Sequence, residues 1–172
     1  MRKIILGVAV SLDGLIEGPN GEYDWCFTDQ DYGMGDFLKN IDAIFYGRKS
    51  FEMMSSIEAG PGPDPFGGKK NYIFSTTLTS APAGYELISD LQMVKEMKAQ
   101  EGRNIWLFGG ASLTSSFMNG NLVDELWLAL HPIVLGKGKP LFNDLNHRVK
   151  LELIESKQYN TGLVSLKYKV AY

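Results

Sequence analysis

Three short segments of the sequence carry residue types suited to binding an anion. They are Gly47-Arg48-Lys49-Ser50, Ser75-Thr76-Thr77 and Gly109-Gly110-Ala111-Ser112, and each follows a short apolar run. Where a strand turns into a helix, free backbone N–H groups and a partial positive charge meet at one point, which suits phosphate. The Gly109-Gly110 turn alone is equally compatible with a tight corner that holds no ligand. Together, two cations and several hydroxyls predict a ligand with several phosphates.

The strands that must position these segments are indicated by apolar, β-rich runs. We predict strands over residues 3–10, 43–46, 71–75, 85–88, 105–108 and 124–133, the last broken by Pro132. Residues 151–159 and 162–171 alternate and are joined across Asn160-Thr161-Gly162, which predicts a β-hairpin. Loops are expected over 11–22 and 60–68, with a turn at 136–138.

The helices between these strands are indicated by apolar residues at helical spacing. We predict one helix over 31–41, with Phe37, Leu38 and Ile41 inward, and one over 89–100. Two more should follow Ser50 and Ser112, the second ending near Gly120. A capping box formed by Ser89 and Gln92 is expected to begin the 89–100 helix, and Gly102 to end it.

The order of these elements predicts an α/β fold in a single domain, residues 1–172. Strand–helix units come first and an antiparallel end follows. We therefore expect a mixed, mostly parallel central sheet flanked by helices, with an antiparallel C-terminal hairpin at one edge. Because right-handed crossovers place the carboxyl ends of parallel strands at one edge, the three anion-binding segments should meet there.

Composition disfavours several classes of function. The 172 residues are 44% apolar and 22% charged, with a formal net charge of −3 and no basic block, so neither nucleic acid nor membrane is an expected partner. The lone cysteine, Cys26, and two histidines disfavour a disulfide, a Cys/His nucleophile and a metal site, and fit a reducing cytoplasm. The N-terminal apolar run is too short for a signal peptide and is interpreted as a strand.

Neither Gly-x-Gly-x-x-Gly nor Gly-x-x-x-x-Gly-Lys-Ser/Thr is present, which disfavours the Rossmann and P-loop classes. Instead, five pieces occur in order: 9–14 (Ala-Val-Ser-Leu-Asp-Gly), 44–50 (Ile-Phe-Tyr-Gly-Arg-Lys-Ser), 73–76 (Ile-Phe-Ser-Thr), 107–113 (Leu-Phe-Gly-Gly-Ala-Ser-Leu) and 131–142 (His-Pro-Ile-Val-Leu-Gly-Lys-Gly-Lys-Pro-Leu-Phe). In these pieces the chain resembles the dihydrofolate reductase-like fold, and within it the C-terminal reductase domain of the bifunctional riboflavin-biosynthesis deaminase/reductase. The pieces span nearly the whole chain, and they are more specific for the superfamily than for the substrate.

The resemblance implies hydride transfer from NADPH to a small-molecule substrate. It implies three groups of cofactor-binding residues: Gly47, Arg48, Lys49 and Ser50 on the phosphates; Ser75 and Thr76 with Arg48 around the adenosine 2′-phosphate; Gly109, Gly110, Ala111, Ser112 and Leu113 around the pyrophosphate. Ala9 and Ile16 would lie near the nicotinamide.

Hydride transfer depends on alignment and exclusion of water, and a proton donor is a further need. Asp13 follows the first strand, near the expected nicotinamide, and could instead be a turn residue. Asp31 resembles, in its distance upstream of the Gly-Arg pair, the acidic residue that grips the pterin in dihydrofolate reductases. Asp36 is a third candidate that could instead be a solvated carboxylate at a helix start.

Aromatic residues could form a stacking wall for a flat substrate. Trp25 and Phe37 are the candidates for substrate binding, together with Phe27, and the alternative is core packing. His131 precedes Pro132 within a predicted strand, so we expect its role to be structural.

The expected substrate is a small heterocyclic or carbonyl compound, with 5-amino-6-(5-phosphoribosylamino)uracil as the one that the resemblance suggests. Residues 20–27 depart from the family pattern, because they are acidic and aromatic and lack the arginines that hold a ribose phosphate. The alternatives are a non-catalytic NADPH-binding module, dihydrofolate reductase activity proper, and a dimeric scaffold without ligand. Relatives of this fold often dimerise, so a homodimer is expected.

Overall fold

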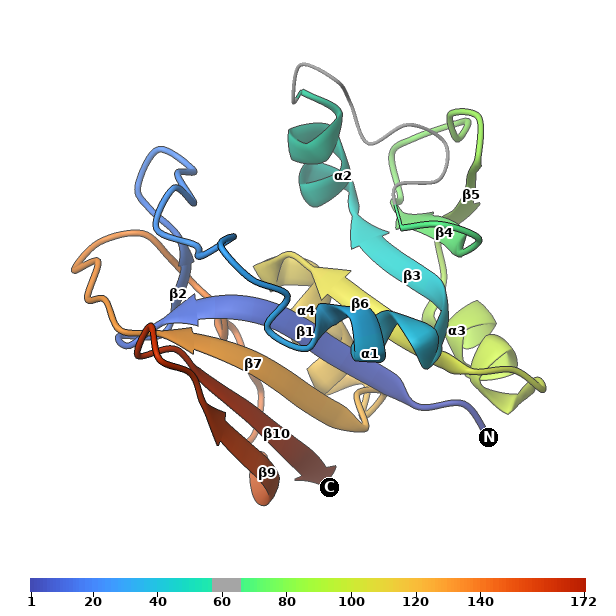
Figure 1. The fold of residues 1–172 in the computed structure, drawn as a ribbon. Helices are drawn as coiled ribbons and strands as arrows, with labels where there is room; N and C mark the ends of the chain where they lie inside the picture. Colours follow the sequence, from blue (N-terminus) through green and yellow to red (C-terminus); the bar gives the residue numbers. More distant parts are fainter. Residues whose placement is uncertain (57–65) are drawn as a thin grey trace.

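The computed structural model describes residues 1–56 and 66–172, which build an eight-stranded sheet in the order β5-β4-β3-β6-β1-β7-β10-β9 (Figure 1). Its strands are β1 (Ile4–Ser11), β3 (Ile41–Gly47), β4 (Lys70–Phe74), β5 (Tyr85–Ile88), β6 (Asn104–Gly109), β7 (Glu125–His131), β9 (Lys150–Gln158) and β10 (Val164–Ala171). The strands from β5 through β7 run parallel, and β10 and β9 are antiparallel. This confirms the predicted mixed sheet with a C-terminal hairpin at one edge.

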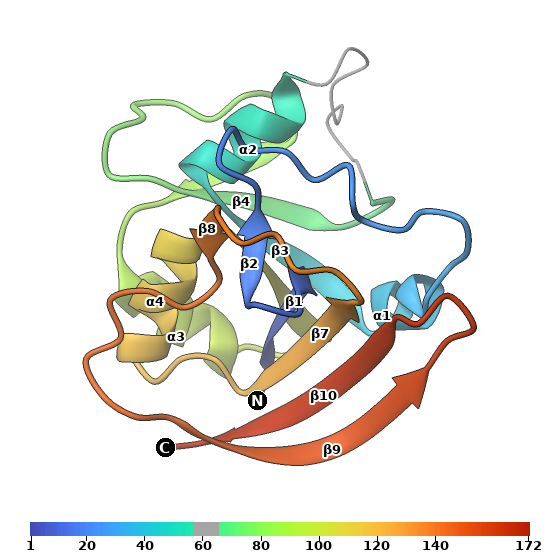
Figure 2. The same ribbon diagram turned by 90° about the vertical axis from the view of Figure 1, so that its left-hand side faces the viewer.

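Helices cover both faces of the sheet (Figure 2). On one face lie α3 (Leu91–Ala99) and α4 (Ala111–Asn119), and on the other lie α1 (Met34–Lys39) and α2 (Arg48–Ser55). None of the helices in the described part of the chain is long and apolar enough to span a membrane.

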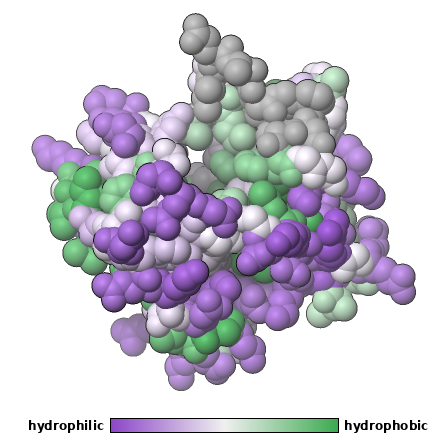
Figure 3. Space-filling model, in the orientation of Figure 1, coloured by the Kyte–Doolittle hydropathy of each residue, from purple (hydrophilic) through white to green (hydrophobic). Residues whose placement is uncertain are grey.

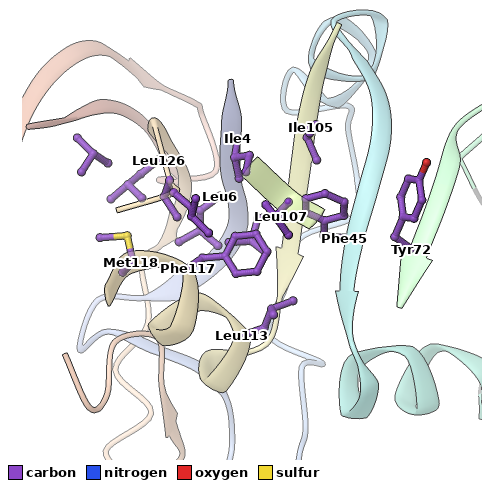
Figure 4. Packing of buried hydrophobic residues seen from close by; sticks show 14 of the residues in the cluster. Ile4, Leu6, Phe45, Tyr72, Ile105, Leu107, Leu113, Phe117, Met118 and Leu126 are labelled. Carbon is purple, nitrogen blue, oxygen red and sulfur yellow. The ribbon is translucent and has the colours of Figure 1, made fainter. Parts of the chain in front are cut away.

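The sheet is buried on both faces because its central strands are apolar at most positions. In β6, Ile105 and Leu107 join the core under α3 and α4, whereas Trp106 faces the opposite core. Figure 4 shows Phe117 of α4 among the side chains of the first core. A fully buried side chain of this size contributes about 1.5–3 kcal/mol to folding. Alternation between two apolar layers explains the continuous apolar runs in the sequence.

Several predicted boundaries were wrong. The 31–41 helix is only α1, because Ile41 is fully buried and begins β3. The capping box is also incorrect: Asp90, not Ser89, caps α3 by accepting the Gln92 N–H at 2.9 Å. An aspartate side chain reaches the amide two residues ahead, which satisfies one free donor of the first turn.

The predicted loop over 11–22 contains a short strand. β2 (Leu15–Glu17) pairs with β8 (Lys139–Pro140) in a separate two-stranded sheet. This partner lies more than a hundred residues away in sequence, so no local pattern indicated it. Most of the predicted 60–68 loop lies outside the described residues.

Candidate functional site

Two strand-to-helix turns meet at one edge of the sheet. β3 turns into α2 at Gly47, and the neighbouring parallel strand β6 turns into α4 through Gly109 and Gly110. A Cβ placed on Gly47 would lie 3.2 Å from the Gly109 carbonyl oxygen, and one on Gly110 would lie 3.1 Å from Ser50 Oγ. Glycines therefore let the two turns pack against each other, so that the first turns of α2 and α4 are neighbours.

Both helices begin without a capping side chain. Among the described residues, no side chain caps α2 or α4, and neither helix has an acidic residue in its first turn. α2 even begins with Arg48 and Lys49, two cations at the positive end of the helix dipole, where acidic residues are normally favoured. Free N–H groups and cations at neighbouring helix starts form a site for an anion.

A buried hydroxyl beside this turn has no partner. Thr114, in the second turn of α4, is fully buried, and its Oγ1 makes no hydrogen bond to any described residue. This oxygen lies 3.7 Å from the position that a Cβ on Gly109 would take. The peptide bond between Gly109 and Gly110 is cis. The donor set and the close approach permitted by the glycines fit a phosphorylated ligand such as a dinucleotide.

The third predicted segment lies beside α2. Phe74 at the end of β4 pairs with Gly47 of β3, and Ser75 follows it. Ser75 Oγ accepts the N–H groups of Thr77 and Leu78 at 3.2 and 3.0 Å, while Thr76 is exposed. The three segments therefore follow parallel strands that end at the same edge.

A cavity of about 1070 Å³ opens next to the two turns. Of the residues predicted for the site, six line it: Ala9, Ile16, Asp31, Lys49, Ser50 and Gly110. The others lie outside the lining: Asp13, Trp25, Phe37, Gly47, Arg48, Ser75, Thr76, Gly109, Ala111, Ser112 and Leu113. Most of this second group belongs to the turns and helix starts that adjoin the cavity. Arg48 forms an ion pair with Glu52 at 2.6 Å.

Aromatic side chains that sequence reasoning did not assign to the site form much of the cavity lining. Trp106 of β6 and Trp127 of β7 lie in this lining with Phe108. Trp106 Nε1 donates to the Gly7 carbonyl at 2.9 Å, and Trp127 Nε1 donates to Ser165 Oγ at 2.8 Å. Because both indole N–H groups are satisfied, these rings offer the cavity apolar surface. Figure 3 shows residues of high hydropathy gathered below α2 on this face of the molecule.

Phe37 lies behind this lining. Its ring centroid is 5.3 Å from that of Trp106 and 4.4 Å from that of Trp127. Phe37 therefore supports the two indoles and does not itself line the cavity. Trp25 also lies outside the lining, and its ring meets that of His131 in an edge-to-face arrangement with the two centroids 5.3 Å apart.

His131 holds the segment that forms one wall of the cavity. The wall runs over residues 20–34, and Phe27 N–H donates to His131 Nε2 at 3.1 Å. The other ring nitrogen, Nδ1, lies 2.9 Å from the Ala129 carbonyl oxygen, so the neutral ring carries its proton on Nδ1. Burial lowers the pKa of His131, which favours this neutral form.

The Asp13 carboxylate holds a loop. It accepts hydrogen bonds from the Ser11 hydroxyl at 2.7 Å and from the backbone N–H groups of Leu135 and Gly136 at 3.1 and 2.8 Å. The Ser11 bond, followed by the Gly136 N–H, lowers the pKa of Asp13 to about 2. An acid this strong is ionised at neutral pH and is unsuited to donate a proton, so the geometry does not support its predicted role.

Asp31 is the candidate carboxylate in the cavity lining. Its two oxygens accept the N–H groups of Gly33 at 3.0 Å and Gly35 at 2.9 Å, which fixes the carboxylate just before α1. Asp36 instead faces Lys39, whose hydrogen bond lowers the pKa of Asp36. The Cys26 thiol also lines the cavity, and burial raises its pKa to about 11, so it is protonated and poorly nucleophilic.

Both the sequence and the fold resemble those of known proteins. The family model described as RibD C-terminal domain matches residues 69–165. The protein YyaP of Bacillus subtilis (strain 168), named as uncharacterized, is 45% identical over 97% of this chain and 94% of its own length.

Two solved structures resemble the fold. A protein from Shewanella sp. PV-4 named "Putative riboflavin biosynthesis protein" superposes with a TM-score of 0.84, at 26% identity and with 100% of both chains covered. A diaminohydroxyphosphoribosylaminopyrimidine deaminase/5-amino-6-(5-phosphoribosylamino)uracil reductase from Thermotoga maritima gives a TM-score of 0.74 at 12% identity, covering 99% of this chain and 57% of that one. The second likeness concerns the fold alone. By the match to the family model and the extent of these similarities, the chain belongs to the RibD C-terminal domain family.

Proposed function

We propose that this protein is an NADPH-dependent reductase of a small heterocyclic or carbonyl substrate. One observation carries the proposal: the uncapped starts of α2 and α4 meet beside an aromatic-lined cavity. The relatives add a reductase-like family. The Shewanella protein is named for riboflavin biosynthesis and the Thermotoga protein as a 5-amino-6-(5-phosphoribosylamino)uracil reductase, which makes that uracil compound one candidate substrate.

The residues of the two turns would hold the cofactor. The first-turn N–H groups of α2 and α4 and the Lys49 ammonium would neutralise the pyrophosphate, and Ser75, Thr76 and Arg48 would hold a 2′-phosphate. Ala9 and Ile16, in the lining near β1, would contact the nicotinamide.

When bound, NADPH supplies a hydride to a C=N or C=O carbon of the substrate, one proton completes the product, and NADP⁺ is left. The protein's part is to align the substrate against the cofactor and to exclude water. Trp106 and Trp127 provide fixed apolar surfaces for this, and the Asp31 carboxylate provides a polar group that orients the substrate. The wall held by His131 closes one side.

A charge reversal at the start of α4 tests the phosphate site. Ser112 is exposed in the first turn, so Ser112→Glu should improve the helix dipole interaction and keep or slightly raise the melting temperature. The same carboxylate should repel the pyrophosphate and weaken NADPH binding at least tenfold, measured by quenching of tryptophan fluorescence. Ser116→Glu, one turn later and also exposed, is the matched control. Unchanged NADPH affinity in Ser112→Glu would refute the site.

A second variant tests the choice of cofactor. Arg48→Ala should weaken NADPH by about 1–3 kcal/mol and NADH far less, because a charged partner of the 2′-phosphate is removed. Arg148→Ala, an exposed cation outside the cavity lining, is the control. Equal weakening of both cofactors would remove Arg48 from this role. NADPH that binds but is never oxidised by any substrate would favour the non-catalytic binding module.

We also propose that the protein is a cytoplasmic homodimer. β9 is an edge strand exposed along its length, with Leu151, Leu153 and Ile154 40%, 58% and 54% exposed. Hydrophobic surface lies where this strand begins (Figure 3). An unpaired apolar edge strand suits association with a second copy. Leu153→Glu should shift the mass in sedimentation from dimer to monomer, whereas Glu152→Gln should not.

A further inference from the structure

The cavity offers flat apolar surfaces as well as the proposed phosphate site. Trp106, Trp127 and Phe108 line it, and Phe27 and Tyr32 contribute from the wall. The Phe27 and Tyr32 rings stack, with centroids 6.3 Å apart at an interplanar angle of 29°. Both indole N–H groups are already bonded, so they cannot serve a polar ligand. Surfaces of this kind bind a planar ring.

Cations are scarce in this lining. Among the described lining residues there is no arginine, and the two lysines are Lys49 and Lys139. Lys139 is paired with Glu17 at 2.7 Å, and Lys49 stands at the start of α2 beside Ser50 and Gly110. The sequence of residues 57–65, outside the described part, contains no lysine or arginine.

The charge that stands beside the wall is negative. Asp31 follows Thr28 and Gln30 in the lining, directly before Tyr32. Each Asp31 oxygen accepts one backbone N–H and keeps capacity for another donor. A phosphate placed at this end would meet a carboxylate and no free cation in the described lining, which opposes its binding.

From this distribution we infer that the substrate is a planar ring without a phosphate group, which presents N–H donors to Asp31. The inference rests on the proposed reductase function and specifies its substrate class. It separates this chain from a reductase whose substrate carries a ribose phosphate, because the described lining has no cation left to hold that group.

A pair of compounds that differ only in the phosphate tests the inference. 5-Amino-6-(5-phosphoribosylamino)uracil and the same compound after phosphatase treatment would be titrated against the protein saturated with NADP⁺, by calorimetry. We expect the dephosphorylated compound to bind at least tenfold more tightly. Tighter binding of the phosphorylated form would overturn the inference, and so would binding of neither compound while NADP⁺ binds.

Two variants sharpen the result. Gln30→Arg adds a cation to the lining and should improve binding of the phosphorylated compound at least tenfold, with little change for the other. Asp31→Asn keeps one acceptor oxygen for α1 and should weaken the dephosphorylated ring at least tenfold, whereas Asp36→Asn, outside this lining, should not. If Asp31→Asn binds the ring as tightly as the wild type does, Asp31 is not the recognition group. NADP⁺ titration is the separate readout. If the wild type does not bind NADP⁺, the proposed reductase function is refuted, and not only the proposed substrate class.

Discussion

Protonation of His131 should detach the cavity wall from the sheet. The neutral ring accepts the Phe27 N–H on Nε2 and faces the Ala129 carbonyl with Nδ1. A proton added to Nε2 would place two N–H donors against each other. Within the described chain, the Phe27 N–H has no other hydrogen-bond partner to turn to. His131 is 3% exposed, so water cannot readily satisfy the displaced groups. The Phe27 N–H would then stand unpaired in a partly buried position.

The magnitude follows from the bond that is lost. An unsatisfied buried donor costs about 1–3 kcal/mol. Burial lowers the His131 pKa in the folded state, while the unfolded chain keeps a pKa near 6.5. The unfolded state therefore binds more protons between the two values, and stability rises with pH there. The contribution is fully present above about pH 6.5 and is lost as the pH falls toward the folded pKa, by at most about 1.4 kcal/mol per pH unit.

Urea unfolding of the wild type and of His131→Gln between pH 5 and pH 8 measures this effect. Glutamine can offer an acceptor oxygen to the Phe27 N–H but does not titrate. We expect the wild type to lose about 1–2 kcal/mol more than the variant over this range, because only about 1.5 pH units lie below pH 6.5 and the carboxylates common to both cancel in the difference. His147→Gln, at the exposed second histidine, should behave as the wild type. If His131→Gln and the wild type show the same pH dependence, the reasoning about the wall fails.

Three further predictions concern the frame around the site. Asp13→Asn should speed hydrogen exchange at the Leu135 and Gly136 amides in NMR spectra, since the pKa of about 2 shows a carboxylate bound in its charged form. In the wild type this protection should persist at neutral pH and fade as the pH drops toward 2. Phe117→Ala should cost about 3–5 kcal/mol in chemical denaturation, because the ring is fully buried, and a loss under 1 kcal/mol would contradict the packing. Asp90→Ala should cost about 1 kcal/mol by the same measurement through the lost cap of α3, and no loss would mean that the cap is dispensable.

The sequence predicted the sheet well because its strands are buried on both faces. Continuous apolar runs such as residues 3–10 and 105–108 are typical of central strands between two layers. The same continuity concealed the cavity. Trp106 and Leu107 are neighbours in one apolar run, yet Leu107 packs under α4 whereas Trp106 lines the cavity. Apolar character predicts that a residue is buried, but it does not tell whether the residue packs under a helix or lines a cavity.

Long-range contacts were out of reach for a different reason. The bond between Phe27 and His131 joins residues 104 positions apart, and the Asp13 carboxylate reaches Gly136 across 123 positions. The sequence around Asp13 indicates a turn, but nothing local reveals that a distant loop supplies the amides. The fold separates the two candidates, because Asp13 binds a loop whereas Asp31 lines the cavity.

The way each helix begins provides a final argument for an anion at the paired turns. α3 starts with an aspartate cap and follows β5, the strand at the outer end of the sheet. α2 and α4 follow the inner neighbours β3 and β6, and both begin after a glycine with no cap. A capping aspartate before α2 or α4 would satisfy a first-turn amide, as Asp90 does in α3. Its negative charge, however, would occupy the place of a phosphate. Carboxylates bind first-turn amides in the other two helices, Asp90 in α3 and Asp31 in α1, whereas α2 and α4 have no such carboxylate, which is the pattern expected if the missing partner is an anionic ligand.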